Sequence, residues 1–226
     1  MAEITSPGAI ERQSMKIIAG ELEDKGICLP EEYRPVVHRV IHATADFDFV
    51  EALRFTPHAV SHGVKAVRGG VIVTDTNMAL AGLNRSAMAR LGTQAHCLMA
   101  EAFIAEEARK KETTRAAVSM EWALERYPGA VFAVGNAPTA LFRLAEGIDA
   151  GARPALIIGV PVGFVNVAES KERLWECCLR RRIPAIAAMG RKGGSGVAAA
   201  VCNALLYTAA DMLDPERRTG QPRIPS

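Results

Sequence analysis

The spacing of apolar residues along the chain changes near residue 52. Before that point, apolar positions recur at helical intervals from Ile10 to Ile18 and again from Val36 to Ile41, with a Leu29-Pro30 break between them. We therefore expect residues 1–52 to form a helical N-terminal segment.

Beyond residue 70 the pattern becomes one of short aliphatic runs, each followed by a stretch with helical spacing. Strands that alternate with helices indicate a parallel sheet covered by helices on both faces. We expect an α/β fold with a doubly wound, mainly parallel sheet in residues 70–213. Residues 1–213 are interpreted as a single domain, and residues 214–226 as a loose tail. The predicted strands are Val71–Thr74, Ala95–Met99, Val131–Val134, Ala155–Val160 and Ile183–Ala188.

Polar and glycine-rich segments follow four of these runs. They are residues 74–78 (TDTNM), 135–141 (GNAPTAL), 159–171 (GVPVGFVNVAESK) and 190–196 (GRKGGSG). In doubly wound sheets the ligand crevice lies outside the carboxyl ends of the strands, so these segments are predicted to line it. The candidate binding residues are Thr74, Asp75, Asn136, Thr139, Gly163, Phe164, Arg191, Lys192, Gly193, Gly194 and Ser195.

The segment GRKGGSG precedes an alanine-rich helical stretch from Val197 to Ala210. Glycines let backbone amides approach a ligand, and a helix amino terminus favours an anion. The spacing fits neither common phosphate-binding fingerprint, and Val197 breaks the G-x-S-x-G pattern that would make Ser195 a nucleophile. A tight turn without a ligand explains the segment equally well. In GNAPTAL, helix capping by Asn136 and Pro138 is a comparable alternative.

Composition adds few constraints. The 226 residues carry a net charge of +2, which is too small to indicate a nucleic-acid partner, so an anion site must be local. Five cysteines without paired spacing suggest free thiols in a cytoplasmic protein. The first ten residues lack the pattern of an export signal, and no apolar run reaches about 18 residues, so no membrane association is expected.

Histidines four residues apart, His38 with His42 and His58 with His62, could each share a helix face. Arg39 stands where a zinc-protease helix carries Glu, and no third ligand is obvious, so we expect no metal. A single working histidine is the better interpretation, because imidazole exchanges protons near neutral pH. From the residues alone, a histidine placed like His42 is more often a packed core residue, so this alternative stays open.

Two groups of arginines have simple structural explanations. Arg115 lies early in a predicted helix from Glu112 to Arg126, where it can be an ordinary surface charge. Arg180, Arg181 and Arg182 end another helix and complement its dipole.

In order and combination, the motifs resemble the precorrin-8X methylmutase family, including the cobalt-precorrin-8 methylmutases. The resemblance spans nearly the whole chain. It rests on IERQSMKII (residues 10–18), VIHA (40–43), TDTNMALAG (74–82), TTRAA (113–117), GNAPTAL, PVGFVNVAESK and GRKGGS. The Lys192 form of the last motif looks more like the cobalt-dependent branch. Asn166-Val167 departs from the Gly-Ala that is more common in the family.

The resemblance implies a methyl shift from ring carbon 11 to ring carbon 12 of precorrin-8X or cobalt-precorrin-8. The product is hydrogenobyrinate or cobyrinate, held tightly, and no cofactor is consumed. His42 matches the family's catalytic histidine, while Ser14 and Arg115 match positions associated with substrate binding. A homodimer with its tetrapyrrole pocket near the subunit interface is also implied.

The resemblance and the chemistry favour His42 as a general acid, with Arg115, Arg191 or Lys192 and backbone amides binding the carboxylates of the ring. Two alternatives from other classes remain. A tetrapyrrole carrier without catalysis would use the same pocket, and a nucleotide-binding α/β enzyme would explain the glycine loops but not their failed fingerprints.

Overall fold

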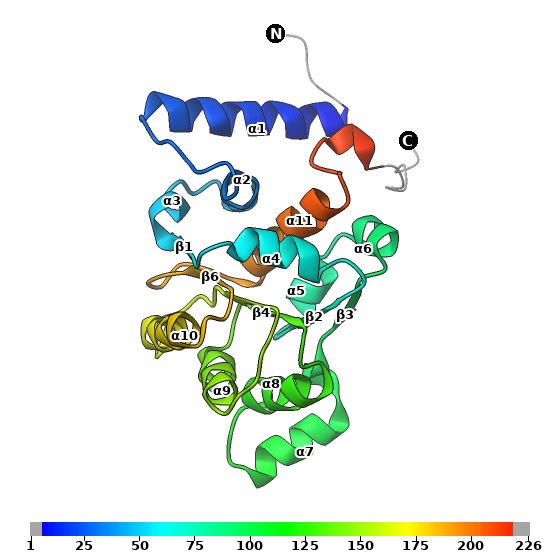
Figure 1. Ribbon diagram of the computed structural model, residues 1–226, viewed down its shortest axis with the longest axis vertical. Helices are drawn as coiled ribbons and strands as arrows, with labels where there is room; N and C mark the ends of the chain where they lie inside the picture. The colour runs from blue at the N-terminus through cyan, green and yellow to red at the C-terminus, as the bar shows by residue number, and fades with distance from the viewer. Residues whose placement is uncertain (1–5, 219–226) are drawn as a thin grey trace.

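A six-stranded sheet runs through the middle of the protein in a computed structural model that describes residues 6–218, with Glu216 described by its backbone alone (Figure 1). The strand order is β1-β6-β5-β4-β2-β3, and every pairing is parallel except the antiparallel one between β1 and β6. The strands are β1 (Leu53–Phe55), β2 (Val71–Thr74), β3 (Gln94–His96), β4 (Val131–Val134), β5 (Leu156–Gly159) and β6 (Ala185–Ala188).

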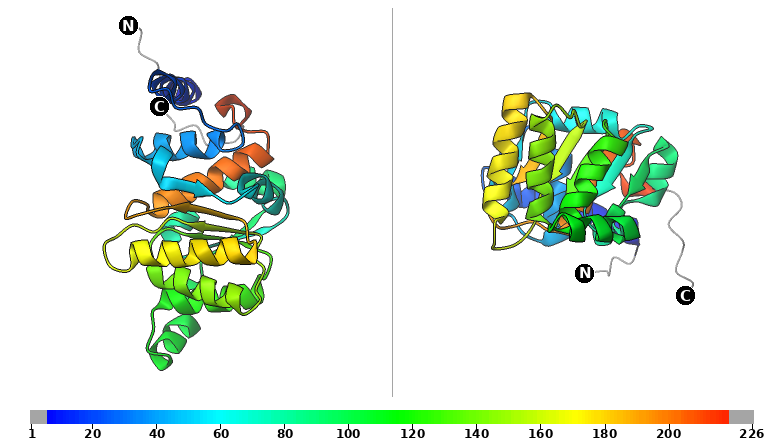
Figure 2. Two further views of the ribbon diagram at one scale, coloured as in Figure 1. Left: turned by 60° about the vertical axis from the view of Figure 1, so that its left-hand side comes forward. Right: turned by 90° about the horizontal axis from the view of Figure 1, so that it is seen from below.

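Helices cover both faces of this sheet in distinct layers (Figure 2). One face carries α2 (Arg34–Thr44), α4 (Ala59–Ala66), α5 (Asn77–Ala81), α6 (Arg85–Leu91) and α11 (Ser195–Ala209), with α1 (Pro7–Asp24) outermost. The other face carries α8 (Arg115–Arg126), α9 (Pro138–Asp149) and α10 (Val167–Arg181), with α7 (Ala102–Lys110) beyond them. The short elements are α3 (Phe49–Ala52) and the 3-10 turns η1 (Leu98–Ala100) and η2 (Pro215–Arg217).

Burial on both faces explains why the strands read as continuous aliphatic runs. In β4, Val131 and Ala133 pack into the core beneath α2 and α11, whereas Phe132 and Val134 pack against α8, α9 and α10. All four residues are fully buried. Alternate side chains of a strand enter opposite layers, so both must be apolar.

The predicted doubly wound α/β fold is confirmed. The predicted bounds of β2 and β4 agree with the structure, while the run expected as a strand from Ala95 to Met99 ends at His96 and continues as η1. Strand β1 was not predicted. The helices expected around residues 10–18 and 36–41 are α1 and α2. The single-domain interpretation stays a prediction.

The winding of the sheet reverses between β2 and β4. The chain passes from β2 outward to β3, then crosses to β4 on the other side of β2 and continues through β5 to β6. In doubly wound sheets, ligands commonly bind at the carboxyl ends of the strands beside such a reversal. No helix within residues 6–218 is long and apolar enough to cross a membrane.

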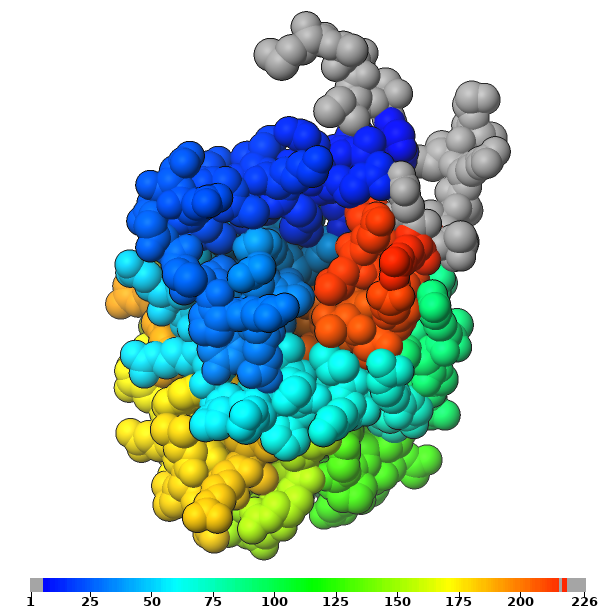
Figure 3. Space-filling model, turned by 45° about the horizontal axis from the view of Figure 1, so that its top comes forward, coloured from blue at the N-terminus to red at the C-terminus, as the bar shows by residue number. Residues whose placement is uncertain are grey.

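The first residues of the expected loose tail are packed rather than loose. Arg218 donates to both oxygens of Glu11 at 2.8 and 2.6 Å, and its guanidinium lies 3.9 Å from the ring centre of Tyr207. Arg39 of α2 also pairs with Glu11, at 2.6 Å. These contacts join α1, α2 and α11 to the C-terminal segment, which lies beside α1 (Figure 3). Residues 219–226 lie outside the described chain.

Replacing Arg218 by Ala should lower the free energy of unfolding by about 2 kcal/mol, because it removes a nearly buried partner of Glu11. For a chain of this length, the midpoint of thermal unfolding should fall by roughly 4–8 °C. Arg217→Ala is the matched control, since Arg217 pairs with Asp211 in an exposed position and should shift the midpoint little.

Acid provides a second check of this ion pair. Burial raises the pKa of Glu11, but hydrogen bonds and charges from Arg218 and Arg39 lower it overall. The stabilisation is therefore complete above about pH 4.5 and is lost as the pH falls through the lowered pKa. Equal unfolding midpoints for Arg218→Ala and the wild type at neutral pH would contradict the assignment.

Candidate functional site

Asp75 directly follows β2 and links it to the loop after β4, where the winding of the sheet reverses. Its carboxylate accepts three backbone amide hydrogens from the loop after β4: Gly135 at 2.9 Å, Asn136 at 2.8 Å and Ala137 at 2.9 Å. The side chain is fully buried, and burial raises its pKa, which the three amides offset only in part. Asp75 was expected to touch a ligand, but its burial gives it the role of fixing the β4–α9 loop.

Thr74 and Ser195 also fix loops to one another. The hydroxyl of Thr74, which is fully buried, donates to the carbonyl of Thr76 at 3.0 Å. The hydroxyls of Thr76 and Ser195 are 2.8 Å apart. A β-carbon added to Gly135 would lie 2.6 Å from the α-carbon of Ser195, so only glycine lets these two backbones approach. Together these contacts bring the loops after β2, β4 and β6 to one place.

Lys171 of α10 fixes the glycine-rich loop after β6 through hydrogen bonds to its backbone. This side chain is fully buried, and its ammonium donates to the carbonyls of Gly190 at 2.9 Å and Lys192 at 2.8 Å. Burial lowers the pKa of Lys171 to about 8. Gly193 has φ of 157°, and a β-carbon there would lie 2.1 Å from the carbonyl oxygen of Val160. The amide of Gly194 donates to that same oxygen at 2.8 Å.

The loop after β5 presents an apolar tip beside this glycine-rich loop. The amide of Gly163 donates to the carbonyl of Arg191 at 3.2 Å, which ties the two loops together. Phe164 is 82% exposed, and the guanidinium of Arg191 lies 5.4 Å from its ring centre. An exposed aromatic ring stacked with a cation forms a surface that suits a flat, anionic molecule.

Lys192 joins the glycine-rich loop to the chain just after α2. Its ammonium bonds to Asp46 at 2.7 Å and also to Asp48. Asp46 lies four residues beyond His42, which is exposed in the last turn of α2. The structure thus places His42 on the same side as the loops at the carboxyl edge of the sheet.

Charged residues around His42 disfavour its protonation. Burial lowers the pKa of its imidazole, Arg39 and Arg218 lower it further, and Glu11 partly opposes them. In the free protein at neutral pH, the imidazole is therefore mostly uncharged. An anion bound nearby would raise this pKa again.

The other predicted residues lie on two helix starts and on α1. The hydroxyls of Thr139, in the first turn of α9, and Thr114, which caps α8, are 2.7 Å apart, so exposed Arg115 begins a helix next to α9. Asn136 is exposed, but the cap expected from it does not form, because α9 begins after Ala137 without a side-chain cap.

Ser14 lies one helical turn beyond Glu11 on α1, and its hydroxyl donates to the carbonyl of Ile10. Ser14 is therefore close in the chain to the Glu11–Arg39 ion pair. Arg39, in turn, lies about one helical turn before His42 on α2. Within residues 6–218, Ser14 forms no direct hydrogen bond to the loops at the sheet edge.

The two histidine pairs have different environments. His38 and His42 both lie on α2, whereas His58 precedes α4 with φ of 60° and so is not on one helix with His62. His62 instead bonds through Nδ1 to the carbonyl of His58 at 2.8 Å. Across residues 6–218, no group of three or more His, Cys, Asp or Glu side chains is placed to hold a metal ion.

Sequence reasoning did not assign Lys171, although a signal for it was present. The buried side of α10 consists of Val167, Ser170, Lys171, Leu174, Cys177 and Cys178. Lys171 therefore falls on the apolar stripe at helical spacing, where a charged residue requires partners. The Glu11–Arg39–Arg218 cluster gave no such signal, because its members are far apart in the chain.

Comparisons with known proteins show which chains this one is similar to. A family model described as precorrin-8X methylmutase matches residues 9–208. A cobalt-precorrin-8 methylmutase of Priestia megaterium is 41% identical over 205 residues, covering 90% of this chain and 88% of the relative. A precorrin-8X methylmutase of Pseudomonas aeruginosa is 43% identical over 199 residues, covering 87% and 93%.

Among solved structures, a precorrin-8X methylmutase from Thermus thermophilus has the same fold, with a TM-score of 0.81. It is 42% identical in sequence, and the match covers 90% of this chain and 96% of that one.

Proposed function

Since the chain belongs to the precorrin-8X methylmutase family, we propose that it moves a methyl group from ring carbon 11 to ring carbon 12 of precorrin-8X or cobalt-precorrin-8. It is an isomerase of cobalamin biosynthesis, and we expect it to act in the cytoplasm. The product would be hydrogenobyrinate or cobyrinate. Because the methyl group is already on the substrate, the reaction needs no methyl donor. Relatives named for either substrate are 41% and 43% identical, so identity does not choose between them.

The carboxylates of the ring would bind at the cationic rim of the crevice. Arg115 and Arg191 are exposed at the carboxyl edge of the sheet, and within residues 6–218 neither forms an ion pair. A guanidinium makes strong charge-assisted bonds to carboxylates. The exposed amide of Asn136 and the backbone of the glycine-rich loop supply further donors. This local charge suffices for a polyanion in a nearly neutral protein.

Apolar side chains beside that rim would contact the ring itself. Phe164, Val165 and Met78 are 82%, 76% and 72% exposed. Surfaces of this kind usually mark a binding site or an interface. We therefore propose that the macrocycle lies against these apolar side chains. The proposal also includes a homodimer whose interface lies near the pocket.

His42 would act as the general acid. The imidazolium donates a proton to the conjugated ring as the methyl group migrates, and the neutral imidazole takes the proton back when the new carbon–carbon bond is complete. The interaction accelerates the step only if it is stronger in the transition state than with the bound substrate. Carboxylates bound near His42 would raise its pKa and so charge it in the complex.

One observation carries this proposal: His42 is exposed at the end of α2, four residues before Asp46, which binds Lys192 of the glycine-rich loop. The experiment that tests it mixes the protein with a large excess of precorrin-8X and follows the visible absorbance. An isomerase converts many equivalents of substrate. A change that stops at one equivalent per chain, with the substrate recovered unchanged on unfolding, would instead show a carrier.

A further inference from the structure

A cavity lies at the opposite edge of the sheet from the loops around His42. Its volume is about 640 Å³, and it is bounded by the end of β1, the starts of β5 and β6, α4 and the end of α10. Ligand pockets in proteins typically occupy about 300–1,000 Å³. The size is therefore that of a site for a small organic molecule.

The cavity has an apolar wall and basic side chains. Pro57, Leu179 and Ile183 are among its apolar lining residues, and Cys178 contributes a neutral thiol whose pKa burial raises to about 12. His62, Arg153 and Arg182 also line it, whereas no Asp or Glu among the described residues does. A cavity of this composition suits a molecule with an apolar body and an anionic head.

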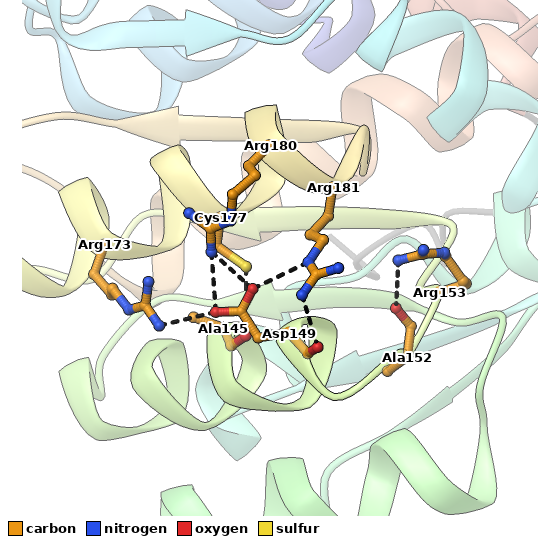
Figure 4. Close-up of polar contacts among 8 residues, drawn as sticks. All are labelled: Ala145, Asp149, Ala152, Arg153, Arg173, Cys177, Arg180 and Arg181. Carbon is orange, nitrogen blue, oxygen red and sulfur yellow. Dashed lines mark hydrogen bonds and ion pairs between the residues drawn. The ribbon is translucent and has the colours of Figure 1, made fainter.

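The arginines of this cavity are not neutralised by their neighbours. Asp149 is the acidic residue shown in Figure 4, and three arginines outside the cavity lining bind it: Arg173 at 2.9 Å, Arg180 at 2.7 Å and Arg181 at 3.2 Å. Arg180 is the main cause of the lowered pKa of Asp149. Within residues 6–218, the guanidinium of Arg153 donates only to the carbonyl of Ala152, at 3.5 Å (Figure 4).

Arg182 likewise forms no ion pair within residues 6–218. It follows the last turn of α10 with φ of 56°, a conformation in which glycine or asparagine is usual. The negative pole of α10 would oppose an anion, but backbone amides already occupy its last carbonyls. Arg182 donates to Leu179 at 3.3 Å, and Ile183 donates to Cys178 at 2.9 Å. The arginines are therefore the charged side chains that line the cavity.

We propose that this cavity binds an amphiphilic organic anion, a molecule with a carboxylate or sulfonate head on an apolar body, with Arg153 and Arg182 holding the head. The site is separate from the crevice at His42 and does not depend on the function proposed for it. Binding there would stabilise the folded chain in proportion to ligand concentration.

The test uses 8-anilinonaphthalene-1-sulfonate as the probe and N-phenyl-1-naphthylamine, which has the same aromatic body without the sulfonate, as the neutral comparison. The wild-type chain should bind about one equivalent of the sulfonate with enhanced fluorescence. Arg153→Gln and Arg182→Gln should each weaken it about tenfold, because each removes a charge-assisted hydrogen bond. Binding of the neutral probe should be unaffected by either change.

Three further variants test where the probe binds. Ala155→Trp, which fills the cavity and keeps both arginines, should abolish binding. Arg90→Gln, which changes an exposed arginine on α6 that does not line the cavity, should leave it unchanged, and Arg153→Lys should recover part of the affinity. Unaltered sulfonate affinity in both Arg153→Gln and Arg182→Gln would overturn the proposal, as would a loss in Arg90→Gln alone. Neither result bears on methyl transfer, which is assayed separately.

Discussion

Replacing His42 by Ala is expected to lower the single-turnover rate of methyl migration by about 10²–10⁴-fold, the usual contribution of a general acid. The ring would still bind, because Arg115, Arg191 and the apolar tip are untouched. The dissociation constant of the product should therefore change much less than the rate. Rapid mixing with excess protein, followed by visible absorbance, measures the rate directly.

Two variants make this result specific to the imidazole proton. His42→Gln keeps a hydrogen-bond donor of similar size but cannot deliver a proton, so it should be as slow as His42→Ala. His58→Gln changes an exposed histidine at the start of α4 and should retain the wild-type rate. A wild-type rate in either His42 variant would refute the general-acid role.

Replacing Lys171 by Met should lower both turnover and stability, because the carbonyls of Gly190 and Lys192 would lose their buried donor. Unsatisfied buried carbonyls cost about 1–3 kcal/mol each, and removing a buried charge offsets part of this loss. We expect the free energy of unfolding to fall by about 2 kcal/mol. Misplacement of the loop by about 1 Å can reduce the rate on the order of 10²-fold.

Two control variants separate the effect of a misplaced loop from the effect of losing a lysine charge. Lys65→Met changes an exposed lysine on α4 and should affect neither quantity. Lys192→Met removes an exposed ion pair, so it should lower stability much less than Lys171→Met does. If Lys171→Met matched Lys65→Met in both stability and turnover, the position of the glycine-rich loop would not depend on the hydrogen bonds of Lys171.

The pH dependence of stability gives Lys171 a further signature. Its pKa is about 8 in the folded chain, against an ordinary value of 10.5. Between these two pH values the unfolded chain holds a proton that the folded chain has released, so stability rises with pH in this window. The wild type should therefore gain stability relative to Lys171→Met as the pH increases from 8 to 10.5.

The sheet could be predicted from sequence where local pattern alone determines structure. The strands Val71–Thr74 and Val131–Val134 are covered by helices on both faces, so their sequences are continuous aliphatic runs that can be recognised locally. Strand β1, with only three residues, gave no comparable signal. It exists because it pairs with β6, more than 130 residues away in the chain, and such a partner is not visible locally.

The site could be predicted as a region but not in its internal contacts. The carboxyl edge of a doubly wound sheet follows from topology, so the loops were expected in the right place. Whether Asp75 faces a ligand or the interior depends on amides that lie about 60 residues further on. The substrate-binding roles of Ser14, Arg115 and Asn136 stay predictions, because only a bound ring would test them.

The central claim is that the imidazole of His42 faces a bound polyanionic ring. The most direct measurement is the NMR titration of histidine ring resonances in the full chain, with and without hydrogenobyrinate, using His42→Gln to assign the signal among five histidines. The account predicts a pKa below 6.5 in the free protein and an increase when the product binds. If the pKa and chemical shift of His42 did not change at a saturating concentration of the product, His42 would not face the bound ring.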